Sequence, residues 1–475
     1  MKIVIRYCGG LLLIGTLLLF FTPTYPLYAA PATDATVGVP ITLTLSTAGN
    51  GSIDAQPPGP TYGYGAVVTL TANPDPGHEF VAWSGDLTSV DDWWAPLWNY
   101  RIALNVGANG YERVDKPAEA TIDFTALLSA AGEATAFDPN SLRVVEIDAT
   151  GQVIDNSVPF QFDDADSDGA GTLVFLLSGT TAVNAGRTYH VYFDVAGKGF
   201  TLPNFTDQVV LTDNVTDQGQ SSFQISTANA TYYYHKAGGG FSSLVDSDNK
   251  DWIDYRRNIA GAGGTFRGIP NMIYPEGEFH PGATGSASTV VSSGPLKETI
   301  RTVTSNGKWE ALWELFPTYA RMTVLKADHD YWFLYEGTPG GTFDAASDFL
   351  VRSDGTQNLL SADWQADLAG EEWVYVGDPN RNRSIFLAHH EDDSAVDSYK
   401  PLNNLMTVFG FGRQNSPTAS KMNQQPGYFT IGLIDELSYT PAAKQIRGAY
   451  KDLVVTAAPP GSSSDAGHGS AAVRR

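Results

Sequence analysis

Short runs of alternating apolar and polar residues recur along most of the chain with a period of two. Residues 41–45 (ITLTL), 67–71 (VVTLT) and 143–147 (RVVEI) show this clearly. The period is typical of half-buried β-strands, and clusters of glycine and proline between the runs predict turns. From residue 205 to residue 452 the chain lacks any long helical periodicity. The pattern therefore predicts an all-β protein.

The same pattern predicts two small accessory β domains followed by a large antiparallel β-sandwich or supersandwich. We place the accessory domains at 38–90 and 93–200 and the large domain at 205–455. The tail at 457–475 is rich in Gly, Ser and Ala and is expected to be disordered. A chain of 475 residues is long enough for two or three separate cores.

Residues 1–30 have the layout of a cleavable secretory signal peptide. Lys2 and Arg6 precede an apolar run at 11–21, and alanines follow it. The run is shorter than the roughly 20 residues of a membrane span, so no stable membrane anchor is predicted; a retained N-terminal anchor is the alternative. The single cysteine, Cys8, lies inside this segment, so no disulfide is expected. We expect a secreted, extracellular protein.

The formal charge of −23 and the pI near 4.6 argue against nucleic acid as a partner, because phosphates demand a basic face. The sequence contains no Walker loop, Rossmann glycine fingerprint or G-x-S-x-G elbow, which argues against a nucleotide cofactor and serine hydrolase chemistry. The 22 Tyr and 10 Trp supply rings on which sugars can stack, although most such rings belong to cores. An extracellular polysaccharide is the expected partner.

Residues 49–87 read GNGSIDAQPPGPTYGYGAVVTLTANPDPGHEFVAWSGDL. The glycine-rich opening, the V-T-L-T-A strand and the closing F-x-x-W-S-G-D resemble the small bacterial surface repeat related to the internalin B-repeat. Such modules act as spacers or adhesive units, so this resemblance implies no chemistry. The next unit opens with WWAPLWNYR at 93–101 and resembles an accessory β-sandwich of secreted bacterial proteins.

The large domain carries GGG at 238–240, DSDNKDW at 246–252, FRGIPN at 266–271 and SGPL at 293–296. These motifs resemble the galactose-mutarotase-like supersandwich of several polysaccharide lyases, accessory domains of glycosidases and sugar epimerases. The resemblance implies a carbohydrate-active domain. Export makes an epimerase the weaker expectation, because sugar phosphates and nucleotide sugars are mostly cytoplasmic.

The loop at 267–282 holds the densest mixture of polar side chains, namely Arg267, Asn271, Tyr274, Glu276 and His280. Its Gly and Pro residues predict irregular backbone, where sites are usually built. A lyase that acts on a uronate needs a base such as His or Tyr, and a cation or amide to neutralise the sugar carboxylate. We therefore expect catalysis by His280 and Tyr274 and substrate binding by Arg267 and Asn271. The alternative is a structural loop in which Arg267 pairs with Glu276 or Glu278.

A strand predicted at 331–335 ends in a glycine-rich turn, and side chains at such strand ends face clefts. Trp332 and Tyr335 are expected to bind substrate, and Glu336 is expected to be catalytic. Hydrolysis of a glycoside normally needs two carboxylates on opposite sides of the bond. In a hydrolase, the partner of Glu336 would be one of three acidic residues: Glu276, Glu314 or Asp254.

Two acidic segments suggest metal binding. Asp164, Asp166 and Asp168 match the opening half of a calcium loop, although Phe175 stands where the final glutamate is expected, and calcium is the one cofactor that we expect. In HHEDD at 389–393, two residues could ligate a metal together with His235 or His280. Adjacent histidines on a strand point to opposite faces, which weakens this second hypothesis. His235 is otherwise expected to bind substrate.

Two functions remain open from the sequence. The first is a secreted bacterial carbohydrate-active protein that degrades a polysaccharide, as a lyase or a glycoside hydrolase. The alternative is a non-catalytic carbohydrate-binding or adhesive cell-surface protein that uses the B-repeat-like module as its stalk. The first is favoured, because the loop at 267–282 has more mixed polar chemistry than stacking on a sugar requires.

Overall fold

A computed structural model describes most of the second half of the chain and parts of the first. The described residues are 2–6, 16–17, 41–42, 44–47, 49–56, 58–59, 61–62, 69–80, 82–85, 94–95, 97–256, 267–273, 277–414, 421–458 and 472–473. The chain divides into two compact units, Met1–Trp98 with Thr150–Val153, and Asn99–Ala149 with Ile154–Arg475.

The first unit is a small β module. Its strands are β1 (Lys2–Arg6), β2 (Thr16–Leu17), β3 (Ile41–Thr42), β4 (Thr44–Thr47), β5 (Gly51–Gln56), β6 (Thr61–Tyr62), β7 (Thr69–Pro74) and β8 (Ala82–Gly85). β5 pairs with β7 in antiparallel orientation, and every second residue of β5 is more buried, as the period of two predicts. β1 pairs with β4 and β8, and β2 with β7. Both β1 and β2 lie within the predicted signal peptide, whose cleavage remains a prediction.

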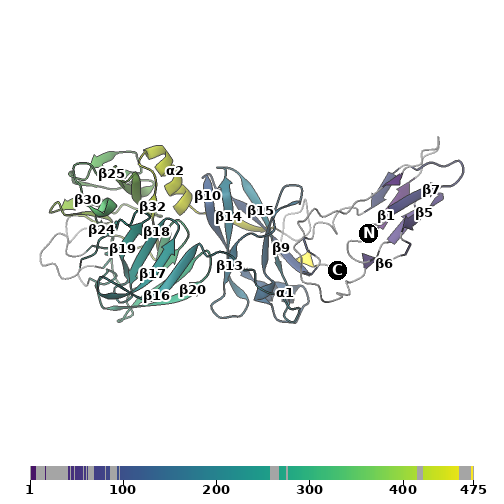
Figure 1. Ribbon diagram of the computed structural model, residues 1–475, viewed down its shortest axis with the longest axis horizontal. Helices are drawn as coiled ribbons and strands as arrows, with labels where there is room; N and C mark the ends of the chain where they lie inside the picture. Colours follow the sequence, from purple (N-terminus) through teal and green to yellow (C-terminus); the bar gives the residue numbers. More distant parts are fainter. Residues whose placement is uncertain are drawn as a thin grey trace. The chain divides into compact units, whose positions relative to one another are not determined.

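The second unit begins with a β-sandwich (Figure 1). Its elements are β9 (Tyr100–Gly107), β10 (Arg113–Asp123), α1 (Phe124–Ala130), η1 (Pro139–Ser141), β11 (Arg143–Ile147), β12 (Val153–Asp155), β13 (Phe160–Asp163), β14 (Ala170–Thr181) and β15 (Gly186–Phe193). One sheet has the order β10-β14-β13, and the other includes β11, β15 and β9. Phe124, Phe175 and Tyr189 are buried in the core between them. The edge of the second sheet is completed from far along the chain, because β33 (Val454–Ala458) pairs with β9, as does β34 (Ala472–Val473).

The rest of the second unit consists of three further sheets. The first, in order, contains β16 (Val209–Asp217), β17 (Gln220–Thr227), β18 (Ala230–His235) and β19 (Gly240–Asp246). The nine-stranded sheet contains, in order, β20 (Ser286–Ser293), β21 (Glu298–Thr304), β22 (Glu310–Leu315), β23 (Ala320–Lys326), β32 (Gly427–Ile434), β29 (Arg383–His389), β28 (Glu372–Asp378), β25 (Phe349–Arg352) and β26 (Gln357–Leu359). The third contains, in order, β24 (Phe333–Gly337), β31 (Met406–Phe411), β30 (Asp397–Leu402) and β27 (Trp364–Ala366).

These sheets share one apolar core, in which Trp313, Phe333 and Phe429 are fully buried. The rings of Phe333 and Phe429 stack with centroids 4.3 Å apart and so join two of the sheets. The all-β sandwich class predicted from the alternation is confirmed.

Helix α2 (Tyr439–Tyr450) corrects the expectation that the region from 205 to 452 forms strands alone. Its buried residues recur along one face of the helix: Ala442, Ala443, Ile446 and Tyr450. The helix ends against β10 (Figure 1), where Arg113 donates hydrogen bonds to the carbonyls of Gly448 (2.9 Å) and Lys451 (2.5 Å). A cation at this position satisfies carbonyls that a helix C-terminus leaves free. The helix therefore fastens the sandwich to the nine-stranded sheet.

Candidate functional site

Strand β24 has two chemically different faces. Phe333 and Tyr335 point into the apolar core, and both are fully buried. Trp332, Leu334 and Glu336 alternate with them and lie on the opposite face, where Leu334 packs against Met406 and Val408. The Tyr335 hydroxyl donates to the carbonyl of Trp252 (2.6 Å). Tyr335 is therefore a core residue with no ring face left for a sugar.

The loop predicted to carry chemistry crosses this strand at Glu336. The N–H of Gly268 donates to the carbonyl of Glu336 (2.7 Å), and the N–H of Glu336 donates to the carbonyl of Gly268 (3.0 Å). Arg267 Nη2 donates to the carbonyl of Leu405 (3.0 Å), which ties the loop to the turn between β30 and β31. Tyr274 and Glu276 lie outside the described residues, so their roles remain predictions.

His280 and Asn271 meet on one oxygen of Glu336. His280 Nε2 lies 3.1 Å from Glu336 Oε2, and Asn271 Nδ2 donates to the same oxygen (3.3 Å). His280 is 5% and Glu336 8% exposed. A carboxylate that shares a proton with an imidazole can act in general acid–base chemistry, while an amide fixes its orientation. We call Asn271, His280 and Glu336 the Glu336 site. In the sequence, His280 precedes Glu336 by 56 residues and Asn271 precedes it by 65.

Two arginines add positive charge close to this site. Arg267 Nη1 pairs with Asp254 Oδ2 (2.5 Å), a residue outside its own loop. Burial lowers the pKa of Arg267, although Asp254 opposes the shift. Burial also lowers the pKa of Arg413, and the negative charge of Glu336 opposes that shift. The Glu336 carboxylate therefore lies in the field of at least one partly desolvated guanidinium, Arg413.

The other predicted partners of the site are spread apart. Trp332 is half-buried, with the Lys421 ammonium 4.6 Å from its ring centre. It precedes Glu336 by four strand residues, a distance of about 13 Å. His235 is 1% exposed; its Nδ1 accepts from the N–H of Gly282 (3.1 Å) and its Nε2 lies 3.1 Å from the carbonyl of Asp217. His235 therefore supports the end of the loop from the core and does not face a substrate.

Two of the three carboxylates predicted to pair with Glu336 in a hydrolase, Glu314 and Asp254, are engaged elsewhere, and the third, Glu276, lies outside the described residues. Glu314 accepts from Arg321 Nε (2.8 Å) and from Lys297 Nζ (3.2 Å). Asp254 accepts from Arg267. Neither is available as the second carboxylate of a glycosidase in this arrangement.

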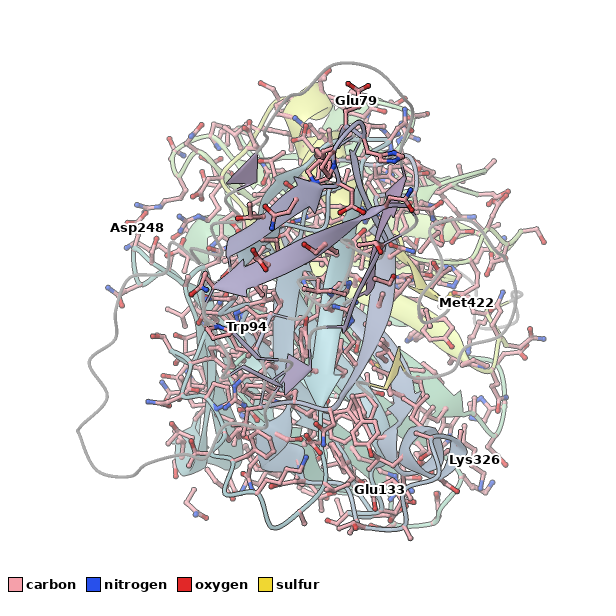
Figure 2. The ribbon with its side chains drawn as sticks, turned by 90° about the vertical axis from the view of Figure 1, so that its right-hand side faces the viewer. Glu79, Trp94, Glu133, Asp248, Lys326 and Met422 are labelled. Carbon is pink, nitrogen blue, oxygen red and sulfur yellow. The ribbon has the colours of Figure 1, made fainter. Side chains whose placement is uncertain are left out.

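In the predicted calcium loop, the carboxylates of Asp164 and Asp168 accept hydrogen bonds from the loop's own backbone N–H groups. Asp164 accepts from the N–H groups of Asp168 (3.2 Å) and Gly169 (2.8 Å), and Asp168 accepts from the N–H of Ala170 (2.9 Å). Asp166 is exposed. Calcium at this loop remains a prediction. In the DSDNKDW segment, the turn around Asp248 is exposed (Figure 2).

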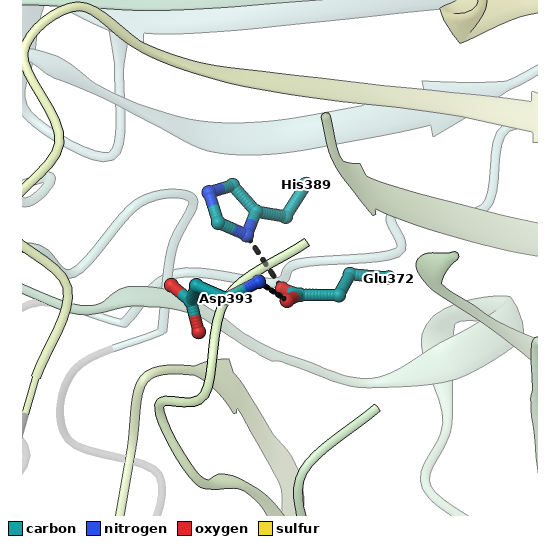
Figure 3. A group of neighbouring side chains, drawn as sticks. All are labelled: Glu372, His389 and Asp393. Carbon is teal, nitrogen blue, oxygen red and sulfur yellow. Dashed lines mark hydrogen bonds and ion pairs between the residues drawn. The ribbon is translucent and has the colours of Figure 1, made fainter. Parts of the chain in front are cut away.

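A second histidine–glutamate pair lies in the nine-stranded sheet (Figure 3). His389 and Glu372 stand opposite each other on β29 and β28, with Nδ1 2.5 Å from Oε2. The backbone N–H of Asp393 donates to the other oxygen of Glu372 (2.6 Å), and His389 Nε2 lies 3.0 Å from Glu391 Oε2. The ligand atoms of Glu372, His389 and Asp393 all lie within 4.8 Å of one another.

Charge pairing explains the His389 cluster without a metal. Burial would lower the pKa of His389, but Glu372 and Glu391 outweigh burial and raise it to about 9. A protonated His389 therefore neutralises the buried carboxylate. Asp393 is also satisfied, since it accepts from the N–H of Ala395 (2.6 Å) and from Gln424 (3.1 Å). The structure brings neither His235 nor His280 into this group of ligand atoms.

Two cavities in the second unit lie away from the Glu336 site. One of about 550 Å³ is lined by residues that include Phe137 and Asp164, and another of about 570 Å³ by residues that include Lys116 and Arg383. Neither lining includes Glu336 or His280. The Glu336 site is therefore distinguished by its side-chain chemistry and not by either of these cavities.

Residues 41–97 match the family model of the divergent InlB B-repeat domain, so the first unit carries a surface repeat. No curated protein matches the chain. A solved structure described as "Crystal Structure Analysis of HI1317" is 12% identical and aligns with 48% of this chain and 99% of its own, with a TM-score of 0.33, which is too low to carry an argument. Among the helices of the described residues, none has the length and apolar character that a membrane crossing needs.

Proposed function

We propose, from the B-repeat at 41–97 and the Glu336 site of the second unit, that this is an extracellular protein that degrades a polysaccharide. The observation that carries the proposal is the contact of His280 Nε2 and Asn271 Nδ2 with one oxygen of Glu336. The half-buried ring of Trp332, about 13 Å from Glu336 along the strand, suits a chain of several sugar units better than a single sugar.

Elimination agrees with this chemistry better than hydrolysis. In a lyase, a base takes the proton beside the sugar carboxylate, the bond to the leaving oxygen breaks, and an acid returns a proton to that oxygen. The His280–Glu336 pair can hold and return the proton, while Arg413 and Asn271 can neutralise the charge that develops on the carboxylate. Hydrolysis would need a second free carboxylate; Glu314 and Asp254 are already paired, and Glu276 lies outside the described residues.

Digestion of a panel of neutral and uronate-containing polysaccharides by the purified chain tests this function. A lyase releases products with a new carbon–carbon double bond, which absorb ultraviolet light, whereas a hydrolase releases reducing ends without that absorbance. We expect unsaturated products from a uronate-containing glycan. Failure to release either product across the panel would overturn the proposal.

The second candidate is a non-catalytic adhesin, which the B-repeat match favours because such modules can serve as stalks. The two functions predict different behaviour of the variants His280→Ala and Glu336→Ala. An adhesin binds its glycan with both variants and never releases product. An enzyme loses product formation with both variants.

A further inference from the structure

Two buried aspartates face each other where β25 meets β28. These strands pair in antiparallel orientation, with Phe349 opposite Gly377. The same register, continued by one residue beyond the paired strands, places Asp348 opposite Asp378, and the charge of Asp378 acts on Asp348. Asp348 is fully buried, and Asp378 is 5% exposed. Because like charges directly opposite each other on neighbouring strands are destabilising, the repulsion in this pair must be offset by a nearby cation or by a proton on one carboxyl.

Two buried oxygens of this region, one on Asp348 and one on Thr338, have no hydrogen-bond partner among the described residues, whereas Asp378 Oδ1 accepts from the N–H of Asn380 (2.8 Å). Asp348 Oδ2 accepts from the N–H of Asp344 (2.9 Å), but its Oδ1 is buried and has no hydrogen-bond partner among the described residues. Thr338 is 3% exposed, and its Oγ1 likewise has no partner in the described part of the chain. The Thr338 hydroxyl does not cap the turn that follows it. Buried polar atoms normally have partners, so each such oxygen calls for an explanation.

The turn η2 (Pro339–Gly341) brings the Thr338 segment onto Asp378. Gly340 has a φ of 61°, and a Cβ at this position would lie 1.8 Å from Asp378 Oδ2. Only glycine lets the backbone come this close and adopt this conformation without strain. The turn that begins at Thr338 therefore lies against the carboxylate of Asp378.

The positive charge near the pair is weak. Arg381 Nε lies 3.9 Å from Asp378 Oδ2, at the outer limit of an ion pair, and its side chain is 36% exposed. Burial raises the pKa of Asp348 to about 7, and the charges of Asp378 and Asp344 add to the rise. Ser347 lies beside Asp348 and lowers that pKa, but its hydroxyl makes no well-formed hydrogen bond to a described residue.

We infer that Asp348, Asp378 and Thr338 form a binding site for a divalent cation of the calcium class. A set of oxygens only, with two carboxylates and a hydroxyl beside an irregular turn, suits calcium. Zinc and copper prefer nitrogen or sulfur ligands, and magnesium demands a more regular octahedron. Thr338 follows Glu336 by two residues, so a cation here would also hold the end of β24 in place. The inference does not depend on the proposed activity.

Calorimetric titration of calcium chloride into the EDTA-treated full chain at pH 8 tests this site. We expect saturable binding, and a rise in Tm of about 3 °C at a hundredfold excess of calcium over Kd. Asp348→Asn should abolish this binding. Thr338→Val, which keeps the shape and removes one oxygen, should weaken it at least tenfold. Asp166→Asn, a matched change in the calcium loop predicted from the sequence, should leave it unchanged.

Absence of saturable calcium binding by the natural chain would overturn the inference. Binding that Asp166→Asn removes, and that Asp348→Asn and Thr338→Val retain, would overturn it as well. If Asp348→Asn does not fold, an unchanged affinity in Thr338→Val decides against the site. An Asp348→Asn chain that is more stable than the natural chain at pH 8, with and without calcium, would show that the aspartates only repel each other.

Discussion

The second unit contains two histidine–glutamate pairs that look alike in composition and differ in setting. His280 and Glu336 come from a loop and a strand, meet at 3.1 Å, and share their oxygen with Asn271. His389 and Glu372 face each other on paired strands at 2.5 Å, and the ring of His389 stacks on Phe429 with centroids 4.9 Å apart. One pair joins a polar loop to the outer face of β24, and the other is enclosed in the core.

The difference shows that the same two residue types can serve chemistry or stability. Carboxylates contact both ring nitrogens of His389, and a backbone N–H donates to Glu372. The proton of this pair therefore has no route to a substrate. The His280 pair carries an amide and lies near Arg413, the groups that stabilise charge on a bound acid. Variants of each pair should therefore fail in different ways.

The largest expected effect is on turnover. His280→Ala removes the imidazole that exchanges a proton with Glu336 and should lower kcat by about 10² to 10⁴-fold. Initial rates of product release from the glycan found in the panel measure this. His329→Ala, a half-buried histidine beside Trp309, is the matched control and should keep its rate. If His280→Ala kept a rate close to that of the natural chain, the claim that the His280 pair serves the reaction would be wrong.

The next effect is on stability. His389→Ala leaves Glu372 as a buried, unpaired charge, which should cost about 3 to 5 kcal/mol of unfolding free energy. Urea denaturation measures the loss, and His280→Ala should lose less than half as much. If the order is reversed, the roles assigned to the two pairs are wrong.

A smaller effect is the pH dependence of that stability. The pKa of His389 is about 9 in the folded chain, above its unfolded value of about 6.5. Its contribution is therefore complete below pH 6.5 and is lost as pH rises towards 9, by up to about 3 kcal/mol. Urea denaturation at several pH values should show this fall in the natural chain. The fall of the unfolding free energy with pH should be smaller in His389→Gln. An equal fall in both chains would contradict the claim that His389 causes it.

The smallest effect concerns the aromatic side chain beyond the Glu336 site. Trp332→Ala should raise KM for a long glycan about 3- to 10-fold, the free energy of one aromatic contact. KM for a disaccharide should not change, because a short substrate at Glu336 does not reach about 13 Å along β24. An equal rise for both substrates would place Trp332 at the reacting sugar instead.

Much of the fold could be predicted from the period of two. Residues 143–147 form β11 with the predicted bounds, and the strand predicted at 331–335 is β24, which begins and ends two residues later. Helix α2 was missed, although its buried alanines and Ile446 follow a helical spacing, because it is short and its mean character is polar. The pairing of β33 with β9 could not be predicted, since it joins residues about 350 apart.

For the site, the sequence supplied residue types but not partners. His280 and Asn271 were predicted from the loop and Glu336 from the end of a strand, and the structure brings the three side chains together. Arg267 was expected to bind substrate, with an ion pair to a glutamate of its own loop as the alternative; it pairs with Asp254, which precedes the loop. Asp348 and Asp378 belong to no motif, because the register of two strands brings them together. Tyr335 was expected at the site, but strand alternation turns it into the core.

The most direct test of the account is the rate and the stability of one variant, Glu336→Gln, measured together. This change keeps the size of the side chain and removes the charge that His280 contacts. We predict a rate on the natural glycan at least 100-fold lower, with an unfolding free energy within about 1 kcal/mol of the natural chain. An unchanged rate, or a loss of rate explained by unfolding, would contradict the claim that Glu336 takes part in the reaction.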